Sequence, residues 1–292
     1  MCITLTEARL PRRWLPILCA AVLVAGCGSS SGSGKASPTA TATDTPTATA
    51  TATPTATATV HSSDLEQLPQ APEPRGNPPS LQGTSRYAFL RAVFDDAEAL
   101  WHRQFQAAGL TYHPARLTIF SQQVHTACGT QPVDVGPFYC PASFGVYLDP
   151  VFFAALSHHV GVHLGDVAQA YVVAHELGHH VQTLLGITQQ KALADKQDPA
   201  RANNRSRRFE LQADCFAGVW MHSVYRRGQL TGEDLQQALD AATVVGDDFA
   251  KNVGGQVRPR EDWTHGSSAQ RRRWLTTGFE EGRPGACDTF SQ

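Results

Sequence analysis

The chain has 292 residues, of which 24 are lysine or arginine and 26 are aspartate or glutamate, so its formal net charge is −2. Residues 1–26 hold three of the arginines and one of the glutamates, and a chain cut after residue 26 keeps 21 basic and 25 acidic residues, a balance of −4. This acidic balance and the lack of a basic stripe exclude nucleic acid as an expected partner.

The first 26 residues predict an export signal. Three arginines precede an apolar stretch over residues 14–25, which is too short to span a membrane comfortably and has the length of a signal-peptide core. Cys27 follows two small residues, as in the lipobox of bacterial lipoproteins. We therefore expect an exported lipoprotein on the extracytoplasmic side of the cell membrane, anchored in the lipid bilayer through Cys27. An ordinary signal peptide cut near Ala25, or an uncleaved anchor, is the alternative.

Residues 27–80 predict a disordered linker. Gly and Ser come first, then a Thr/Ala/Pro-rich repeat, then further polar and proline-rich sequence. Such a stretch has little to bury, so it cannot offset the entropy lost on ordering, and its prolines and threonines favour extended backbone. The remaining residues, 81–292, have the size of a single domain.

The domain begins with a predicted helix over residues 85–108, with Thr84 as N-cap and Gly109 just past its end. Its apolar residues recur every three or four positions, which indicates one buried face. Short β-type runs separated by Gly and Pro follow, and they predict antiparallel hairpins. These strands are expected at residues 116–120, 124–127 and 145–148.

The rest of the chain predicts helices. One runs over residues 166–185, with Asp166 as its cap and Gly186 at its end. Three more are expected over 206–227 before Gly228, from the capping-box pair Thr231/Asp234 to 245, and from the pair Ser267/Gln270 to 280 before Gly282. The fold class is therefore α+β, mostly α-helical with a small antiparallel β-sheet.

Four cysteines remain beyond the signal and Cys27. They are Cys128, Cys140, Cys215 and Cys287, and an even number in an exported domain favours two disulfides. Three pairings are open. Cys128 and Cys140 flank a Gly/Pro-rich turn and could close a short loop, which would leave Cys215 to tie a helix to the C-terminal segment. A four-cysteine metal site is the alternative, but no C-x-x-C pair is present.

The helix over residues 166–185 carries the sequence His175-Glu-Leu-Gly-His179. Residues four apart lie on the same helix face, so both imidazoles can bind one Zn²⁺. Glu176 lies about 100° around the helix from His175, close to the metal without ligating it, where a general base for water belongs. The motif is short and occurs by chance. Here, however, apolar residues surround it, and burying these polar groups is costly unless a metal pairs them.

A third ligand is expected from a second helix. A metzincin would have Gly at Gln182 and His at Leu185, so that class is excluded. Glu210 and Asp214 are four apart on a largely apolar helix and share a face. One can bind the metal while the other accepts the free N–H of a ligating histidine. We expect Glu210 as the ligand and Asp214 as the support, with the reverse as the alternative.

Five segments carry matching motifs in order: residues 136–141 (GPFYCP), 146–149 (VYLD), 168–182 (AQAYVVAHELGHHVQ), 210–220 (ELQADCFAGVW) and 264–270 (THGSSAQ). Together they resemble the bacterial family of neutral zinc metallopeptidases, which is similar to the gluzincins. The resemblance covers the domain after the linker. It implies a zincin-like fold, one Zn²⁺ per chain at His175, His179 and Glu210, catalysis by Glu176 and support from Asp214.

Hydrolysis of a peptide or protein substrate develops an oxyanion that a second donor usually stabilises. His265, in the loop before the last helix, is the main candidate, and Tyr139 and Tyr171 are weaker ones. Gluzincin-like sites bind an extended substrate at a sheet edge, which is expected near residues 146–148 or 137–139. For Phe138 and Tyr139 themselves, core packing is the favoured interpretation.

We therefore expect a zinc metallopeptidase in which Glu176 acts as general base. The alternative is a catalytically silent zinc-binding lipoprotein that serves as a binding or scaffold module at the cell envelope. Glu176 separates the two, because a purely structural site has no use for a general base. A solute-binding lipoprotein is disfavoured, because the two-lobed repeating α/β pattern is missing.

Overall fold

The computed structural model describes residues 65–70, 85–132, 135–160, 165–249 and 259–291. The expected signal peptide, Cys27 and most of the expected linker lie outside these residues. The helices are α1 Arg86–Ala107, α2 Phe152–Val160, α3 Asp166–Leu184, α4 Ile187–Gln197, α5 Ala202–Arg226, α6 Gly232–Val244 and α7 Ser268–Glu281. Short 3-10 helices are η1 Leu65–Gln67, η3 Pro199–Arg201, η5 Arg260–Asp262 and η6 Pro284–Cys287.

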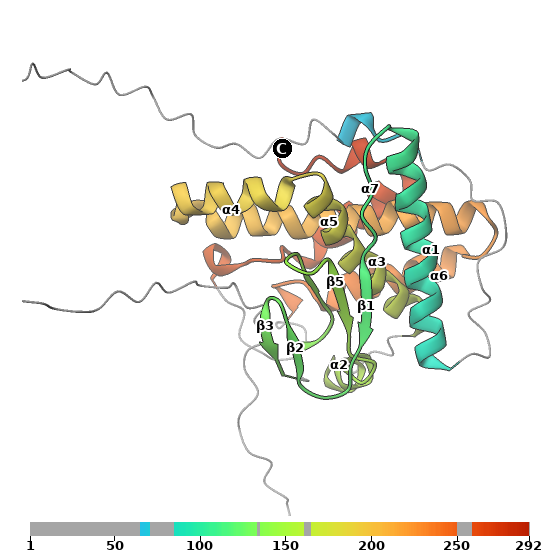
Figure 1. Ribbon diagram of the computed structural model, residues 1–292. Coiled ribbons are helices and arrows are strands. Elements are labelled where there is room, and N and C mark those ends of the chain that lie inside the picture. Colours follow the sequence, from blue (N-terminus) through green and yellow to red (C-terminus); the bar gives the residue numbers. More distant parts are fainter. Residues whose placement is uncertain (1–64, 71–84, 133–134, 161–164, 250–258, 292) are drawn as a thin grey trace, which may run out of the picture.

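Helix α3 lies in the middle of the fold. It packs against α1, α5 and α6 and also contacts the small sheet, and Figure 1 shows it behind the strands with α1 at the side. Most of its side chains are buried, including those of Tyr171, Ala174 and Leu177. The predicted α+β fold class is confirmed. The His-Glu-x-x-His motif lies on α3, a helix that is enclosed on most sides.

The sheet is mixed rather than antiparallel. Its strands are β1 Arg116–Ile119, β4 Phe138–Cys140 and β5 Gly145–Leu148, in the order β1-β5-β4. β4 and β5 pair antiparallel, but β1 runs parallel to β5, so the prediction of hairpins alone was wrong here. The long connection between β1 and β5 allows the parallel pairing, because it carries β4 and the separate antiparallel hairpin of β2 Val124–Thr126 and β3 Gly129–Gln131.

The helix ends follow the sequence in most places. The capping boxes of α6 (Thr231/Asp234) and α7 (Ser267/Gln270) are present as predicted. Helix α1 is capped by Ser85, and Thr84 lies outside the described residues. Gly165, not Asp166, is the N-cap of α3. Asp166 is instead the first helical residue, where a negative charge is stabilised by the helix dipole.

Helices α5 and α7 cross in very close contact, and glycine makes this possible. A Cβ atom on Gly278 of α7 would lie 1.9 Å from the backbone oxygen of Cys215, and one on Gly218 of α5 would lie 2.2 Å from that of Leu275. Both clashes are with backbone, so a side chain at either position would force the helices apart. This crossing presses the first turn of α7 against the part of α5 that carries Glu210 and Asp214.

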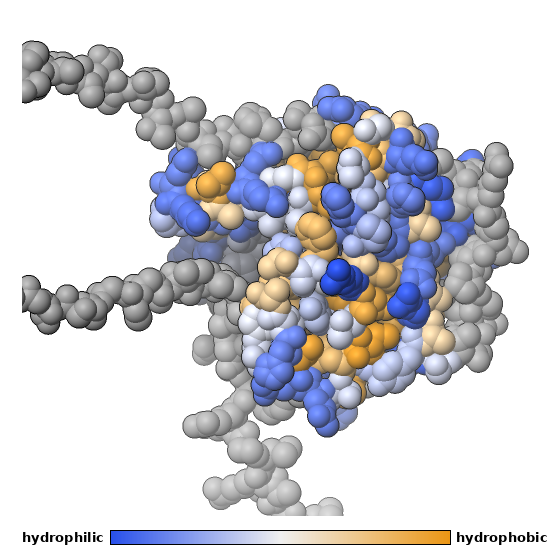
Figure 2. Space-filling view, viewed as in Figure 1, coloured by the Kyte–Doolittle hydropathy of each residue, from blue (hydrophilic) through white to orange (hydrophobic). Residues whose placement is uncertain are grey.

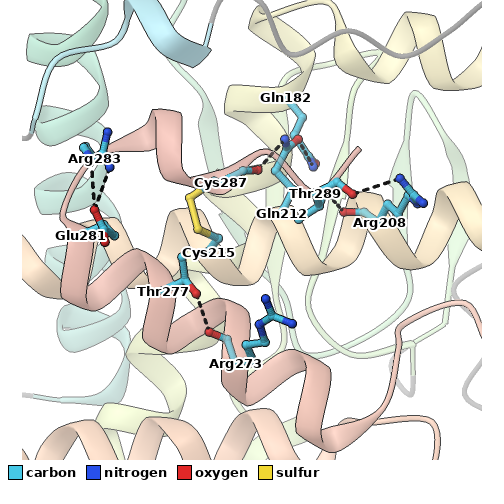
Figure 3. Close-up of a disulfide and its surroundings, with 10 residues drawn as sticks. All are labelled: Gln182, Arg208, Gln212, Cys215, Arg273, Thr277, Glu281, Arg283, Cys287 and Thr289. Atoms are coloured by element: carbon cyan, nitrogen blue, oxygen red, sulfur yellow. Dashed lines mark hydrogen bonds and ion pairs between the residues drawn. A yellow bond between two sulfur atoms is a disulfide. The ribbon is translucent and has the colours of Figure 1, made fainter. Parts of the chain in front are cut away.

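Two disulfides close the fold. Cys128 is bonded to Cys140, and Cys215 of α5 is bonded to Cys287 of η6, so the pairing that the short loop favoured is confirmed. Figure 3 shows the second bond between α5 and the C-terminal segment. It fixes the chain end next to the helix that supplies Glu210.

Part of the expected linker belongs to the folded body. Leu65 and Leu68 are 1% and 4% exposed and pack in a cluster with Trp101 and Phe105. The expectation that residues 27–80 are disordered is therefore wrong for residues 65–70, because these leucines have an apolar surface to bury against.

No helix among the described residues has the length and apolar character that crossing a membrane requires. On the face seen in Figure 2, hydrophilic side chains alternate with hydrophobic ones over α1 and the sheet.

Candidate metal centre

His175, His179 and Glu210 converge between α3 and α5. Each offers a ligand atom, and these atoms all lie within 4.8 Å of one another. Oε2 of Glu210 is 3.2 Å from Nε2 of His175, and its Oε1 is 3.6 Å from Nε2 of His179. Gly178, between the two histidines, lets α5 approach, since a Cβ there would lie 3.0 Å from the Cα of Ala213. Two imidazoles and a carboxylate at this separation form a donor set that suits Zn²⁺.

Asp214 lies behind His175, away from Glu210. Its Oδ1 is 2.9 Å from Nδ1 of His175, so that ring nitrogen donates its proton and Nε2 is left facing Glu210. Arg271 of α7 donates two bonds to Asp214, of 2.7 and 2.8 Å, and the Tyr171 hydroxyl donates a third, of 2.6 Å. Asp214 therefore bonds to the far side of the His175 ring, whereas Glu210 faces Nε2 of both histidines, as expected of a third ligand.

The charges of this group hold both carboxylates ionised. Burial raises the pKa of Asp214, but the Arg271 guanidinium and His175 outweigh it and lower the pKa to about 2. For Glu210, burial likewise raises the pKa, but the charges and hydrogen bonds of His179 and His175 hold it well below its usual range. Ionised oxygens are what a metal ligand and its support require.

Glu176 is buried beside these donors, at 7% exposure. Burial raises the pKa of its carboxyl, while the nearby charges of His179 and His175 lower it, and the net shift is upward. A carboxylate whose proton affinity is raised is a better general base than an exposed one. The position and the shift both match the role expected of Glu176.

His265 precedes α7 and is held by Asp247. Its backbone N–H donates to Oδ2 of Asp247 at 2.7 Å, and its Nδ1 lies 3.3 Å from Oδ1. An electrostatic interaction with His265 is also among the smaller causes of the low pKa of Glu210, so the ring lies near the metal donors. His265 is thus brought to the site by a loop that Asp247 fixes.

The two tyrosines play other roles. The Tyr171 hydroxyl donates to Asp214 and the residue is 1% exposed, so it cannot reach a substrate. The prediction of Tyr171 as a candidate donor to the oxyanion was therefore wrong. The Tyr139 hydroxyl donates to Nδ1 of His180, whose other nitrogen donates to the backbone oxygen of His113. Tyr139 also packs against the core, and Phe138 stacks on Tyr147, so the expected packing role of this pair is confirmed.

The expected substrate edge needs one correction. Residues 146–148 lie in β5, which is the central strand and is paired on both sides. β4, which contains Phe138 and Tyr139, is an outer strand of the described sheet and contacts α3. Of the two expected edges, only this one is available.

Sequence reasoning missed Arg271 and Asp247. Arg271 falls on the buried stripe of α7 with Trp274, Leu275 and Gly278, at steps of three and four, and an arginine on such a stripe signals a buried partner. Asp247 carries no comparable signal, because it lies in a turn after α6 and meets His265 only in the folded chain.

Comparison with known proteins decides the family. Residues 49–290 match the model of the family described as "Putative neutral zinc metallopeptidase". The chain belongs to this family. It is 43% identical over 206 residues to the "Uncharacterized protein YpfJ" of Escherichia coli, which covers 70% of this chain and 71% of that protein. A second relative, the "Uncharacterized protein Rv2575" of Mycobacterium tuberculosis, is 44% identical over 192 residues, or 62% of this chain and 64% of its own. No solved structure matches.

Proposed function

We propose that the protein is a zinc-dependent metallopeptidase that hydrolyses peptide bonds, with Glu176 as general base. The observation that carries the proposal is the convergence of His175, His179 and Glu210 directly beside a buried carboxylate that is not one of the three donors. A site that only stabilises structure is usually closed by a fourth protein ligand, whereas a catalytic one keeps a position open.

Zinc, when bound, supplies a Lewis acid and lowers the pKa of a water molecule toward neutrality. His175 and His179 would hold the metal through Nε2, and Glu210 would add a negative charge. Glu176 takes a proton from the attacking water onto its carboxylate and passes it to the leaving amine. We assign to His265 the stabilisation of the carbonyl oxygen as negative charge develops on it, with Asp247 orienting its ring.

We propose that the substrate is a peptide or protein segment in extended form. The outer strand β4 offers backbone groups beside α3, and an extended chain can pair with such an edge by strand addition. The edge recognises backbone, so affinity would come mainly from main-chain hydrogen bonds.

We also propose that the protein is exported and anchored in the cell membrane by a lipid on Cys27. The apolar stretch over residues 14–25 and the small residues before Cys27 support this. Two disulfides agree with an oxidising compartment.

Glu176→Gln tests the catalytic role. The purified variant should bind zinc as the unchanged protein does. Its rate of hydrolysis of a broad peptide library, measured by mass spectrometry, should be at least 100-fold lower, since general-base catalysis contributes roughly 10²–10⁴-fold. A variant that keeps zinc and keeps the rate would contradict the proposal. An unchanged chain that binds zinc and cuts no peptide would favour the silent zinc-binding lipoprotein.

A further inference from the structure

We propose that Gln182 and Gln212 are positioning residues for the metal centre, and that they form a one-way hydrogen-bond relay from His179 to the disulfide-bonded Cys287. The relay fixes the His179 tautomer that presents Nε2 to the metal. The proposal rests on the proposed zinc function for its purpose, but not for its geometry.

The relay has four members in a continuous line. Nδ1 of His179 is 2.8 Å from Oε1 of Gln182. Nε2 of Gln182 donates to Oε1 of Gln212 at 3.0 Å, and Nε2 of Gln212 donates to the backbone oxygen of Cys287 at 3.0 Å. Figure 3 shows Gln212 between Gln182 and the main chain of Cys287.

The end of the relay sets its direction. A backbone carbonyl can only accept, so the amide nitrogen of Gln212 must face Cys287 and its oxygen must face Gln182. Gln182 must then offer its own oxygen to His179, and its second amide hydrogen goes to the backbone oxygen of Phe209 at 2.7 Å. Only a protonated Nδ1 satisfies that oxygen, so the His179 ring is held with Nε2 turned toward Glu210, where the metal would bind.

Burial makes the relay hard to reverse. Both glutamine side chains are fully buried, so neither amide can turn over and satisfy its groups with solvent. A flipped amide would bring two N–H groups or two oxygens together, and an unsatisfied buried polar group costs roughly 1–3 kcal/mol. The fold therefore sets the orientation of the His179 ring and the proton on its Nδ1 before any metal binds.

The terminal carbonyl is held in place from two directions. The disulfide joins Cys287 to Cys215 of α5, three residues after Gln212. Two residues beyond Cys287, the Thr289 hydroxyl donates to the backbone oxygen of Arg208, also on α5. Figure 3 shows both connections. The C-terminal segment thus becomes part of the metal centre, although it supplies no ligand.

The two histidines are supported by different means. His175 donates to an ionised carboxylate, which Arg271 neutralises. His179 donates to a neutral amide, and no charge lies along the relay up to Cys287. The Asp214 carboxylate is held in place by its ion pair with Arg271, whereas the Gln182 amide depends on every hydrogen bond of the relay being intact. Damage at its far end should therefore reach the metal.

Gln212→Met breaks the relay without touching His179 or Gln182. Gln169→Met is the matched control, because Gln169 is also buried, lies on α3 and has an Oε1 without a hydrogen-bond partner among the described residues. Zinc dissociation constants are measured by competition with a chelating dye on each purified chain. Gln212→Met should bind zinc about 10–100-fold more weakly than the unchanged chain, which is the usual effect of losing an outer-shell partner, and the control should not. Equal affinities in all three would overturn the relay.

A second readout does not need zinc. In metal-free protein, ¹⁵N spectra of the histidine rings should show His179 protonated at Nδ1. Gln182→Met should mix the two tautomers, whereas the control Gln169→Met should keep the first. A mixed tautomer in the unchanged chain, or no difference between these variants, would refute the relay even if Gln212→Met fails to fold. A chain that shows the fixed tautomer but never binds zinc would sink the proposed function and leave the relay standing.

Discussion

Removing each disulfide in turn should have unequal effects on stability and on metal binding. The two variants replace Cys215 and Cys287, or Cys128 and Cys140, with alanine. One bond ties the C-terminal segment to α5, and the other closes a short loop near β4. Both carry the same chemical change, so each is the control for the other.

The expected magnitudes follow from the loops that the bonds close. The partners are 72 residues apart in one bond and 12 in the other. On the loop-entropy model, these separations correspond to about 4.4 and about 2.8 kcal/mol of unfolding free energy, a difference of about 1.6 kcal/mol. The longer loop also carries the end of the relay, so only its loss should weaken zinc binding.

Urea unfolding of metal-free protein, followed by circular dichroism, gives the two stabilities. Metal must be removed, because zinc bound only to the folded state would add its own stabilisation. Zinc affinity is then measured separately on both variants. The reasoning is refuted if the short-loop variant loses as much stability as the long-loop variant, or if both bind zinc equally well.

Two further predictions concern buried residues. Arg271→Met should lower the free energy of unfolding by roughly 3–5 kcal/mol in urea unfolding, because it leaves the fully buried Asp214 carboxylate without its cation. The exposed Arg273→Met on the same helix should change it by less than about 0.5 kcal/mol, and equal losses would contradict the buried ion pair. Leu65→Ala should cost roughly 2–5 kcal/mol if η1 belongs to the folded body. Leu193→Ala, at an exposed position on α4, is its control. If Leu65→Ala leaves the free energy of unfolding unchanged, residues 65–70 belong to the linker and not to the folded body.

The sequence predicted most of what depends on local pattern. The stripe of α1, the capping boxes at Thr231 and Ser267, and the four-residue spacings of His175/His179 and Glu210/Asp214 all follow from helix geometry. The spacing also placed the two pairs on single faces, so that only the packing of α3 against α5 was needed to assemble the site.

The sequence could not predict features that arise from how elements meet. The buried stripe of α7 indicates that Arg271 has a partner, but periodicity does not say that Asp214 is that partner; this depends on the close crossing of α5 and α7 at Gly218 and Gly278. The relay could not be predicted either. In the sequence Gln182 and Gln212 are ordinary polar residues, and only the contact of Gln212 with the Cys287 carbonyl fixes which way their amides donate. The parallel pairing of β1 with β5 depends on the path of a long connection, which periodicity does not report.

The central claim is that His175, His179 and Glu210 hold one catalytic zinc. Native mass spectrometry of the purified chain, beside Glu210→Gln, tests it most directly. The account predicts one zinc per unchanged chain and loss of that zinc, at the same protein and metal concentrations, in the variant. An unchanged chain with no affinity for zinc, or a variant that holds it as firmly, would contradict the account.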